Sequence, residues 1–162
     1  MSQPIHVGMA EFVVAKHPAT LVTLGLGSCI GLVIYDQLSK VAGMVHIMLP
    51  ESPAGKDVPK PGKFADTAVP LLLAEIIKLG ASKSQLRAKI AGGAQMFSMP
   101  GKESAIFSVG SRNIEATTKM LAAAGIRLVA ADTGGSKGRS VEFSTETMKF
   151  TVKTLGSGTK EI

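Results

Sequence analysis

The segment Val41–Leu49 constrains the fold more than any other part of the sequence, because apolar residues occupy both of its faces. Successive side chains of a β-strand point to opposite sides, so a strand with one solvent-exposed face alternates between apolar and polar residues. This segment does not alternate, and His46 is its one polar residue. Such a strand is typical of a sheet that is covered on both faces. The sequence therefore predicts a layered fold.

The rest of the chain contains further strand patterns and two helical patterns. Strands are expected at Ile5–Val14, Leu21–Leu24, Ile30–Tyr35, Leu86–Ala91, Ile126–Ala131, Ser140–Phe143 and Met148–Val152. One helix is predicted to start with Asp66 or Thr67 as its N-cap, because Pro70 is tolerated only in a first turn, and to stop at Gly80. A second helix is predicted from about Ser111 to Ala124, with Ile114, Thr118 and Leu121 on one face.

Together these elements predict an α+β domain, an α/β sandwich of layered β-sheets with two main helices. The length of 162 residues suits one domain, so residues 1–162 are expected to form a single unit. The segment Pro50–Lys63, which holds four prolines, is predicted to be a long loop. The tail 155–162 is expected to be flexible.

Composition narrows the class of protein. The sequence has no run of about 18 apolar residues and no signal-peptide pattern at its start, so a soluble, cytoplasmic protein is expected. A single cysteine excludes an internal disulfide and a multi-cysteine metal site. Residues 1–77 carry 5 basic and 6 acidic groups, whereas residues 78–162 carry 13 and 6. Aromatic residues are only 4% of the chain, so this basic half favours an acidic protein surface over nucleic acid.

The phosphate-binding motifs are incomplete. Gly25 and Gly27 begin a dinucleotide-type pattern, but Ile30 stands where its third glycine is required and no helix pattern follows. Gly101-Lys102 is followed by Glu103, so the P-loop motif fails as well. No metal-binding spacing of histidines is present. Neither a cofactor nor a metal is therefore expected.

Cys29 is the candidate nucleophile. It follows Gly25-Leu26-Gly27-Ser28, and glycines let backbone N–H groups converge on one point. A free cysteine is more often a small buried hydrophobe, and a histidine on an apolar strand is often a satisfied core residue. If strands 30–35 and 41–49 pair as a hairpin, however, His46 returns to the level of Cys29. A Cys–His pair activates a thiol, and a pKa below the ordinary thiol value of about 8.5 is then expected.

Several blocks of the sequence are specific enough to carry a family resemblance. They are Thr23-Leu24-Gly25-Leu26-Gly27-Ser28-Cys29, Gly43-Met44-Val45-His46-Ile47-Met48-Leu49-Pro50, Lys60-Pro61-Gly62-Lys63-Phe64-Ala65-Asp66-Thr67-Ala68, Lys89-Ile90-Ala91-Gly92-Gly93-Ala94, Arg112-Asn113 and Asp132-Thr133-Gly134-Gly135. These blocks resemble the CheD family, the chemoreceptor glutamine deamidases of bacterial and archaeal chemotaxis. The resemblance covers residues 5–153.

The resemblance implies a fold similar to the catalytic domain of the cytotoxic necrotizing factor toxins, which also deamidate glutamine. It implies that Cys29 is the nucleophile, His46 the base and Thr23 the residue that orients the imidazole. Thr23 is assigned from the resemblance alone, since threonine is also simply a good strand residue. The backbone N–H groups of Gly27 and Ser28, with that of Cys29, are the candidates for holding an oxyanion.

The resemblance also implies partners. The substrate would be a helical segment of a methyl-accepting chemotaxis receptor, in which glutamines become glutamates, and glutamyl methyl esters could be hydrolysed by the same groups. A CheC-type phosphatase would be a second partner. Neither nucleic acid binding nor membrane insertion is expected. The loop 51–63 and the region Gly92–Phe107 are the candidate contact surfaces.

Two alternatives from other classes stay open. The chain could be a non-catalytic regulator that binds the phosphatase, with Cys29 as a relic. It could also be a cysteine hydrolase of small amides, for which a deep pocket beside Cys29 would be expected.

Overall fold

Two five-stranded sheets and two helices form three layers in the computed structural model, which describes residues 3–53, 58–95 and 108–162. The strands are β1 Pro4–His6, β2 Phe12–Lys16, β3 Thr20–Leu26, β4 Ile30–Asp36, β5 Val41–Ile47, β6 Leu86–Gly92, β7 Arg127–Thr133, β8 Arg139–Ser144, β9 Phe150–Thr154 and β10 Gly158–Glu161. The helices are α1 Ala65–Lys78 and α2 Val109–Ala123, with short 3-10 turns η1 Pro61–Lys63 and η2 Lys83–Gln85.

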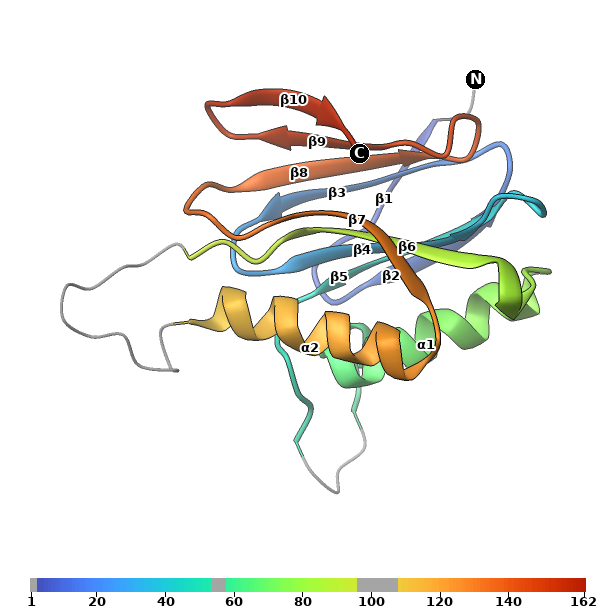
Figure 1. Cartoon of the computed structure of the whole chain (residues 1–162), viewed down its shortest axis with the longest axis horizontal. Helices are drawn as coiled ribbons and strands as arrows, with labels where there is room; N and C mark the ends of the chain where they lie inside the picture. The colour runs from blue at the N-terminus through green and yellow to red at the C-terminus, as the bar shows by residue number, and fades with distance from the viewer. Residues whose placement is uncertain (1–2, 54–57, 96–107) are drawn as a thin grey trace, which may run out of the picture.

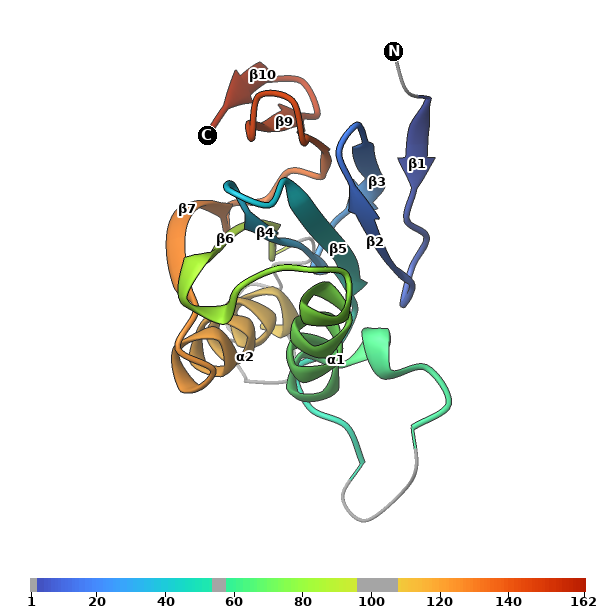
Figure 2. The ribbon, with the colours of Figure 1, turned by 90° about the vertical axis from the view of Figure 1, so that its right-hand side faces the viewer.

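The ten strands form two separate sheets, which make two of the three layers. The outer sheet has the order β1-β3-β8-β9-β10, and the central sheet has the order β2-β5-β4-β6-β7. Figures 1 and 2 show α1 and α2 packed on one face of the central sheet and the outer sheet on its other face. The fold class predicted from the sequence, an α+β layered sandwich, is confirmed. None of the described helices is long and apolar enough to span a membrane.

The core lies in the two spaces between these layers, and β4 shows how one strand serves both. Ile30, Leu32 and Ile34 pack toward the helices, whereas Val33 and Tyr35 pack toward the outer sheet. All seven residues of β5 are buried, as the lack of alternation in this segment predicts. The side chains between the two sheets include those of Met44 and Phe143, so the region around His46 is apolar.

The predicted strand Ile5–Val14 is wrong as one element, because the structure divides it between the sheets. β1 pairs with β3 in the outer sheet, and β2 pairs with β5 in the central sheet. The residues between them cross from one sheet to the other, and Ala10 has a φ of 66° in this crossing. β-branched composition predicts extended backbone but does not tell which sheet it joins.

The predicted N-cap of α1 is also wrong. Phe64 occupies the N-cap position, and Pro70 lies inside the helix. The hydroxyl of Thr67 donates to the carbonyl of Pro61 at 2.6 Å, and the carboxylate of Asp66 accepts from Ser52. Both expected caps are thus engaged with the preceding loop, which fixes the entry to the helix in place of a side-chain cap.

Two further expectations are corrected. On α2 the buried face carries Thr117 rather than Thr118, in line with Asn113 and Leu121. The tail 155–162 is not frayed, because β10 forms an antiparallel hairpin with β9. The glycines that suggested flexibility, Gly156 and Gly158, have φ values of 75° and 87° and build the turn of that hairpin.

Candidate active site

The turn 27–29 that carries Cys29 joins β3 of the outer sheet to β4 of the central sheet. All three of its carbonyl groups accept hydrogen bonds from other segments. The donors are Ala94 N to Gly27 O at 2.8 Å, Asn113 Nδ2 to Ser28 O at 2.8 Å and Gly93 N to Cys29 O at 2.9 Å. The turn is therefore held by β6 and by α2, and its peptide planes have a fixed orientation.

The N–H groups of the same turn differ from its carbonyl groups. Those of Gly27, Ser28 and Cys29 donate no hydrogen bond to any residue in the ranges that the structure describes. With the carbonyls bound on one side of the turn, unpaired donors remain for a ligand. This is the arrangement that an oxyanion site requires, because such a site consists of donors that are oriented before the substrate arrives.

Gly92 allows β6 to approach the turn this closely. A Cβ atom on Gly92 would lie 2.1 Å from the carbonyl oxygen of Cys29, and its φ is 111°. Arg139, from β8, supports the same place by donating to the carbonyls of Gly92 at 3.2 Å and Gly134 at 2.7 Å. Asp132 pairs with this guanidinium at 3.7 Å. A buried cation thus holds the segment on which the turn rests.

His46 lies in β5, directly opposite Gly31 of β4. Only 1% of its surface is exposed. Its backbone N–H donates to the carbonyl of Glu11 at 3.1 Å, and its carbonyl accepts from Ala10 at 3.0 Å. Gly31 lets the outer sheet pack closely here, since a Cβ on it would lie 3.0 Å from Cδ1 of Leu26 and 3.2 Å from Cγ2 of Thr23. The antiparallel hairpin expected from the sequence is present.

The hydroxyl of Thr23 fixes the tautomer of His46. It donates its single proton to the carbonyl of Val7 at 2.7 Å, and it lies 2.7 Å from Nδ1 of His46. A carbonyl can only accept, so the hydroxyl proton is used there and the Thr23 oxygen must accept from Nδ1–H. The imidazole is then protonated on Nδ1, and Nε2 carries the lone pair. The contact uses the side chain of Thr23 and not its backbone.

Nε2 of His46 is buried and has no hydrogen-bond partner among the described residues. Cys29 would stand opposite Met48 if the β4–β5 ladder continued past the pair Ile30–Ile47, which makes it a diagonal neighbour of His46. Diagonal neighbours on one face of a sheet are within reach of longer side chains. Cys29 packs at the edge of the same inter-sheet core. The structure thus brings Thr23 and His46 into contact and places Cys29 beside them without a thiol–imidazole hydrogen bond.

Burial sets the protonation states of this pair. It raises the pKa of the Cys29 thiol and lowers the pKa of the His46 imidazole. Both directions favour a neutral thiol beside a neutral imidazole. This desolvation opposes the sequence-based expectation of a thiol pKa below the ordinary value, because it penalises both charged forms.

Sequence reasoning missed three groups of this site. Asn113 was recognised only as part of a family block, with no role, although a polar residue on the buried face of an amphipathic helix is a usable signal. The carbonyl of Val7 has no sequence signal, since every residue has one. Arg139 gave no signal among the scattered basic residues. Among residues 3–53, 58–95 and 108–162, no three His, Cys, Asp or Glu side chains gather as a metal site.

The chain is similar to a known family and to full-length proteins of several bacteria. Residues 48–154 match the family described as CheD chemotactic sensory transduction. A protein of Desulfitobacterium hafniense, named probable chemoreceptor glutamine deamidase CheD, is 50% identical over 165 residues and covers 100% of both chains. Its counterpart in Caldanaerobacter subterraneus is 49% identical over 161 residues, which is 99% of each chain. The chemoreceptor glutamine deamidase CheD of Halalkalibacterium halodurans is 47% identical over 163 residues and covers 100% of both chains.

Proposed function

The chain belongs to the CheD family, and we propose that it is a protein-glutamine deamidase that converts glutamines of chemotaxis receptors to glutamates in the cytoplasm. The observation that carries this proposal is the likeness of about 50% over the full chain to proteins named chemoreceptor glutamine deamidase. The family match begins at residue 48, so Thr23, Cys29 and His46 lie outside it. The support for their roles is the geometry of the site, in which Thr23 contacts His46 and Cys29 is a diagonal neighbour of His46.

In the first step Cys29 is the nucleophile. As Sγ forms a bond to the side-chain amide carbon of the substrate glutamine, Nε2 of His46 accepts the thiol proton and the carbonyl electrons move to oxygen. A neutral imidazole with its lone pair on Nε2 is the form that can do this, and Thr23 holds that form. The imidazolium then gives its proton to the departing amine, the C–N bond breaks, and ammonia leaves a γ-glutamyl thioester.

In the second step water replaces the thiol. Nε2 of His46 takes a proton from water as the water oxygen attacks the thioester carbon, and the proton passes to sulfur as the C–S bond breaks. The products are the original neutral pair and a glutamic acid side chain, which becomes glutamate when it gives its remaining proton to the released ammonia or to solvent. A glutamyl methyl ester would react by the same two steps with methanol as the leaving group, so we include ester hydrolysis in the proposal.

The tetrahedral intermediate carries a negative oxygen in each step. The N–H groups of Gly27 and Ser28, with that of Cys29, donate to none of the described residues and are the proposed donors for it. Removing one such donor costs about 3–4 kcal/mol in enzymes where it has been measured. The bound carbonyls of the turn support this role because they prevent the donors from turning away.

The proposed partners are a helical receptor segment and a CheC-type phosphatase. The loop 51–63 is a candidate contact surface, and residues 51–53 and 58–63 of it are described. A cavity of about 380 Å³ is lined there by residues of two segments, Ala10, Glu11, Phe12, Val13, Pro59, Lys60, Pro61 and Gly62. Of the second candidate surface, Gly92–Phe107, residues 96–107 lie outside the described residues.

One assay separates this function from the alternatives. The protein is incubated with receptor fragments and, separately, with free glutamine and short glutamine peptides, and conversion of amide to acid is measured by mass spectrometry. We expect conversion at defined glutamines of the receptor fragments and little with the small amides. Conversion of the small amides at equal rates would indicate a general amide hydrolase, and no conversion of either would indicate a non-catalytic regulator.

A further inference from the structure

Asn113 connects the two segments that carry Cys29 and His46. From the buried face of α2, its side-chain Nδ2 donates to the carbonyl of Ser28 at 2.8 Å and to the carbonyl of Met48 at 3.0 Å. Ser28 directly precedes Cys29, and Met48 is the second residue after His46. The side chain has no exposed surface. A single amide group thus bridges the nucleophile turn and the end of the strand that holds the imidazole.

The orientation of this amide is fixed by its partners. Nδ2 carries two protons, and each has a carbonyl oxygen to bind. The reverse assignment would place Oδ1 against two carbonyl oxygens, which are all acceptors. Oδ1 is buried and has no hydrogen-bond partner among the described residues. An unpaired buried acceptor lowers the stability of the fold, so the two hydrogen bonds that Nδ2 donates must offset this cost.

The role of these two hydrogen bonds follows from the position at which the β4–β5 ladder ends. The β4–β5 ladder ends at the pair Ile30–Ile47, and Cys29 lies just beyond it. On the β6 side the turn is held by Gly93 and Ala94. On the β5 side the amide of Asn113 provides the connection that the ladder no longer makes.

Close packing brings α2 into position for this bridge. A Cβ on Gly110 would lie 2.5 Å from the carbonyl oxygens of both Gly93 and Ala94, so the helix approaches the end of β6 to backbone distance. Asn113 follows one turn later, on the same face.

We propose that Asn113 is a positioning residue, whose amide holds the turn of Cys29 at a fixed distance from the end of β5 and thereby aligns the thiol with Nε2 of His46. This role rests on the proposed deamidase function. Asn113 acts through backbone carbonyls, not on the reacting atoms, so its loss is expected to lower the rate of chemistry rather than the affinity for the receptor.

The test compares Asn113→Ala with Thr117→Val. Thr117 lies one turn further along the same buried face, and its hydroxyl has no partner among the described residues, so its removal disturbs α2 without breaking a bridge. Both are assayed on a receptor fragment at a temperature where thermal melts show them folded. We expect kcat of Asn113→Ala to fall about 10- to 100-fold with KM nearly unchanged, since small misplacements of reacting groups cost rates of this order. Thr117→Val should resemble the wild type.

A second variant and a spectroscopic measurement keep the inference testable if Asn113→Ala does not fold. Asn113→Leu retains the size of the side chain and removes both donors without adding a charge, so it should show the same loss of kcat. In the wild-type protein, NMR should show both side-chain protons of Asn113, the one asparagine of the chain, protected from exchange. The backbone amides of Cys29 and Leu49 share peptide groups with the two bound carbonyls, and they should shift in Asn113→Leu but not in Thr117→Val.

Several results would overturn the inference: a kcat in the folded Asn113 variants equal to that of Thr117→Val, a rise in KM alone, or rapid exchange of the Asn113 side-chain protons. A wild-type protein that deamidates no receptor fragment would instead contradict the proposed function. The NMR measurements would still decide whether the bridge exists, so the two failures are distinguishable.

Discussion

At the scale of single residues, the Thr23 hydroxyl is expected to orient His46 without being needed for the fold. Thr23→Val is nearly isosteric, yet it removes the acceptor for Nδ1–H of a buried imidazole. We expect kcat to fall about 10- to 100-fold, which corresponds to an orienting bond worth about 1.5–3 kcal/mol. The measurement is kcat with folding checked by thermal melt, and Thr117→Val serves as the control for loss of a buried hydroxyl. A stable Thr23→Val enzyme with wild-type kcat would reject the orienting role.

The protonation states of Cys29 and His46 give a prediction of pH dependence. Burial raises the pKa of the thiol, so iodoacetamide should label this single cysteine with a midpoint above the ordinary thiol value of about 8.5. Burial lowers the pKa of His46, so Nε2 stays unprotonated below the usual histidine range and kcat/KM should decline only below about pH 6.5.

The His46→Ala variant completes this test. Because the resting pair is neutral, removing the imidazole should leave the alkylation midpoint nearly unchanged while it abolishes deamidation. A midpoint below about 8.5 in the wild type that rises in His46→Ala would instead demonstrate a preformed thiolate–imidazolium pair.

Cys29 and His46 could be predicted from the local sequence, whereas Thr23 could not. Cys29 and His46 could be found because each breaks a local pattern, one after a glycine-rich turn and the other in an apolar strand. Thr23 does not break a pattern, and only the resemblance to a family pointed to it. Its partner, the carbonyl of Val7, is brought over it by the crossing between β1 and β2, which depends on tertiary packing.

At the scale of elements, Gly92 at the end of β6 is expected to determine the position of the nucleophile turn. Gly92→Ala would place a Cβ 2.1 Å from the carbonyl oxygen of Cys29, at a φ of 111° that side chains rarely adopt. We expect a lower melting temperature and a loss of kcat greater than 10-fold. The control is Gly125→Ala, since Gly125 also has a positive φ, 73°, but open space around its Cβ.

Both variants place a side chain at a positive φ, and only Gly92→Ala adds the contact with the carbonyl oxygen of Cys29. Gly125→Ala should therefore lose some stability and keep its kcat. If Gly92→Ala retained the kcat of the control, the close contact between β6 and the turn would not matter for catalysis.

The periodicity of the sequence predicted the positions of most strands and of both helices. It did not predict where α1 begins or how the C-terminal tail folds. The start of α1 was misplaced because Asp66 and Thr67, which look like caps, bind the preceding loop. The tail was misjudged because glycines that suggest disorder also suit a tight turn. In both cases the deciding partner is distant or ambiguous in sequence, so local patterns could not identify it.

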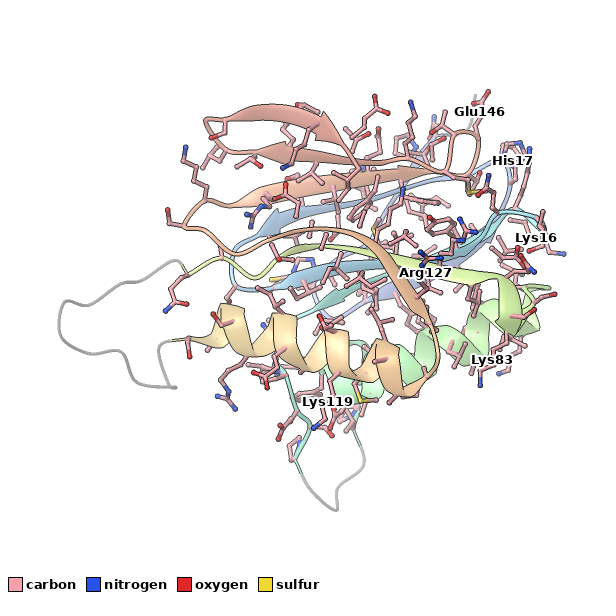
Figure 3. All side chains as sticks on the ribbon, viewed as in Figure 1. Lys16, His17, Lys83, Lys119, Arg127 and Glu146 are labelled. Atoms are coloured by element: carbon pink, nitrogen blue, oxygen red, sulfur yellow. The ribbon has the colours of Figure 1, made fainter. Side chains whose placement is uncertain are left out.

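At the scale of the whole molecule, Arg87 and Arg127 form a basic end that lies away from the nucleophile. Arg87 and Arg127 are paired at the start of β6 and β7, whereas the turn of Cys29 rests on the end of β6. Figure 3 shows Lys16, Lys83 and Arg127 toward the right-hand side of the molecule, and β6 ends on the left in Figure 1. This basic end can therefore steer or hold an acidic receptor surface without taking part in the chemistry.

Charge reversal tests this separation. The double variant Arg87→Glu/Arg127→Glu should raise KM for a receptor fragment about ten-fold at low salt and leave kcat unchanged. Added salt should raise KM of the wild type and reduce the difference between the two proteins. An unchanged KM at every ionic strength would show that this end of the molecule takes no part in receptor binding.

The central claim is that Cys29 attacks the glutamine amide, and Cys29→Ala tests it most directly. Deamidation of a receptor fragment is followed by mass spectrometry for the wild type and the variant, with affinity for a CheC-type phosphatase measured by calorimetry as a control for folding. We predict that the variant loses deamidation and keeps phosphatase affinity, because the nucleophile is one small side chain and an interface spreads over many. Deamidation by Cys29→Ala at a rate near that of the wild type would contradict the assignment of the nucleophile.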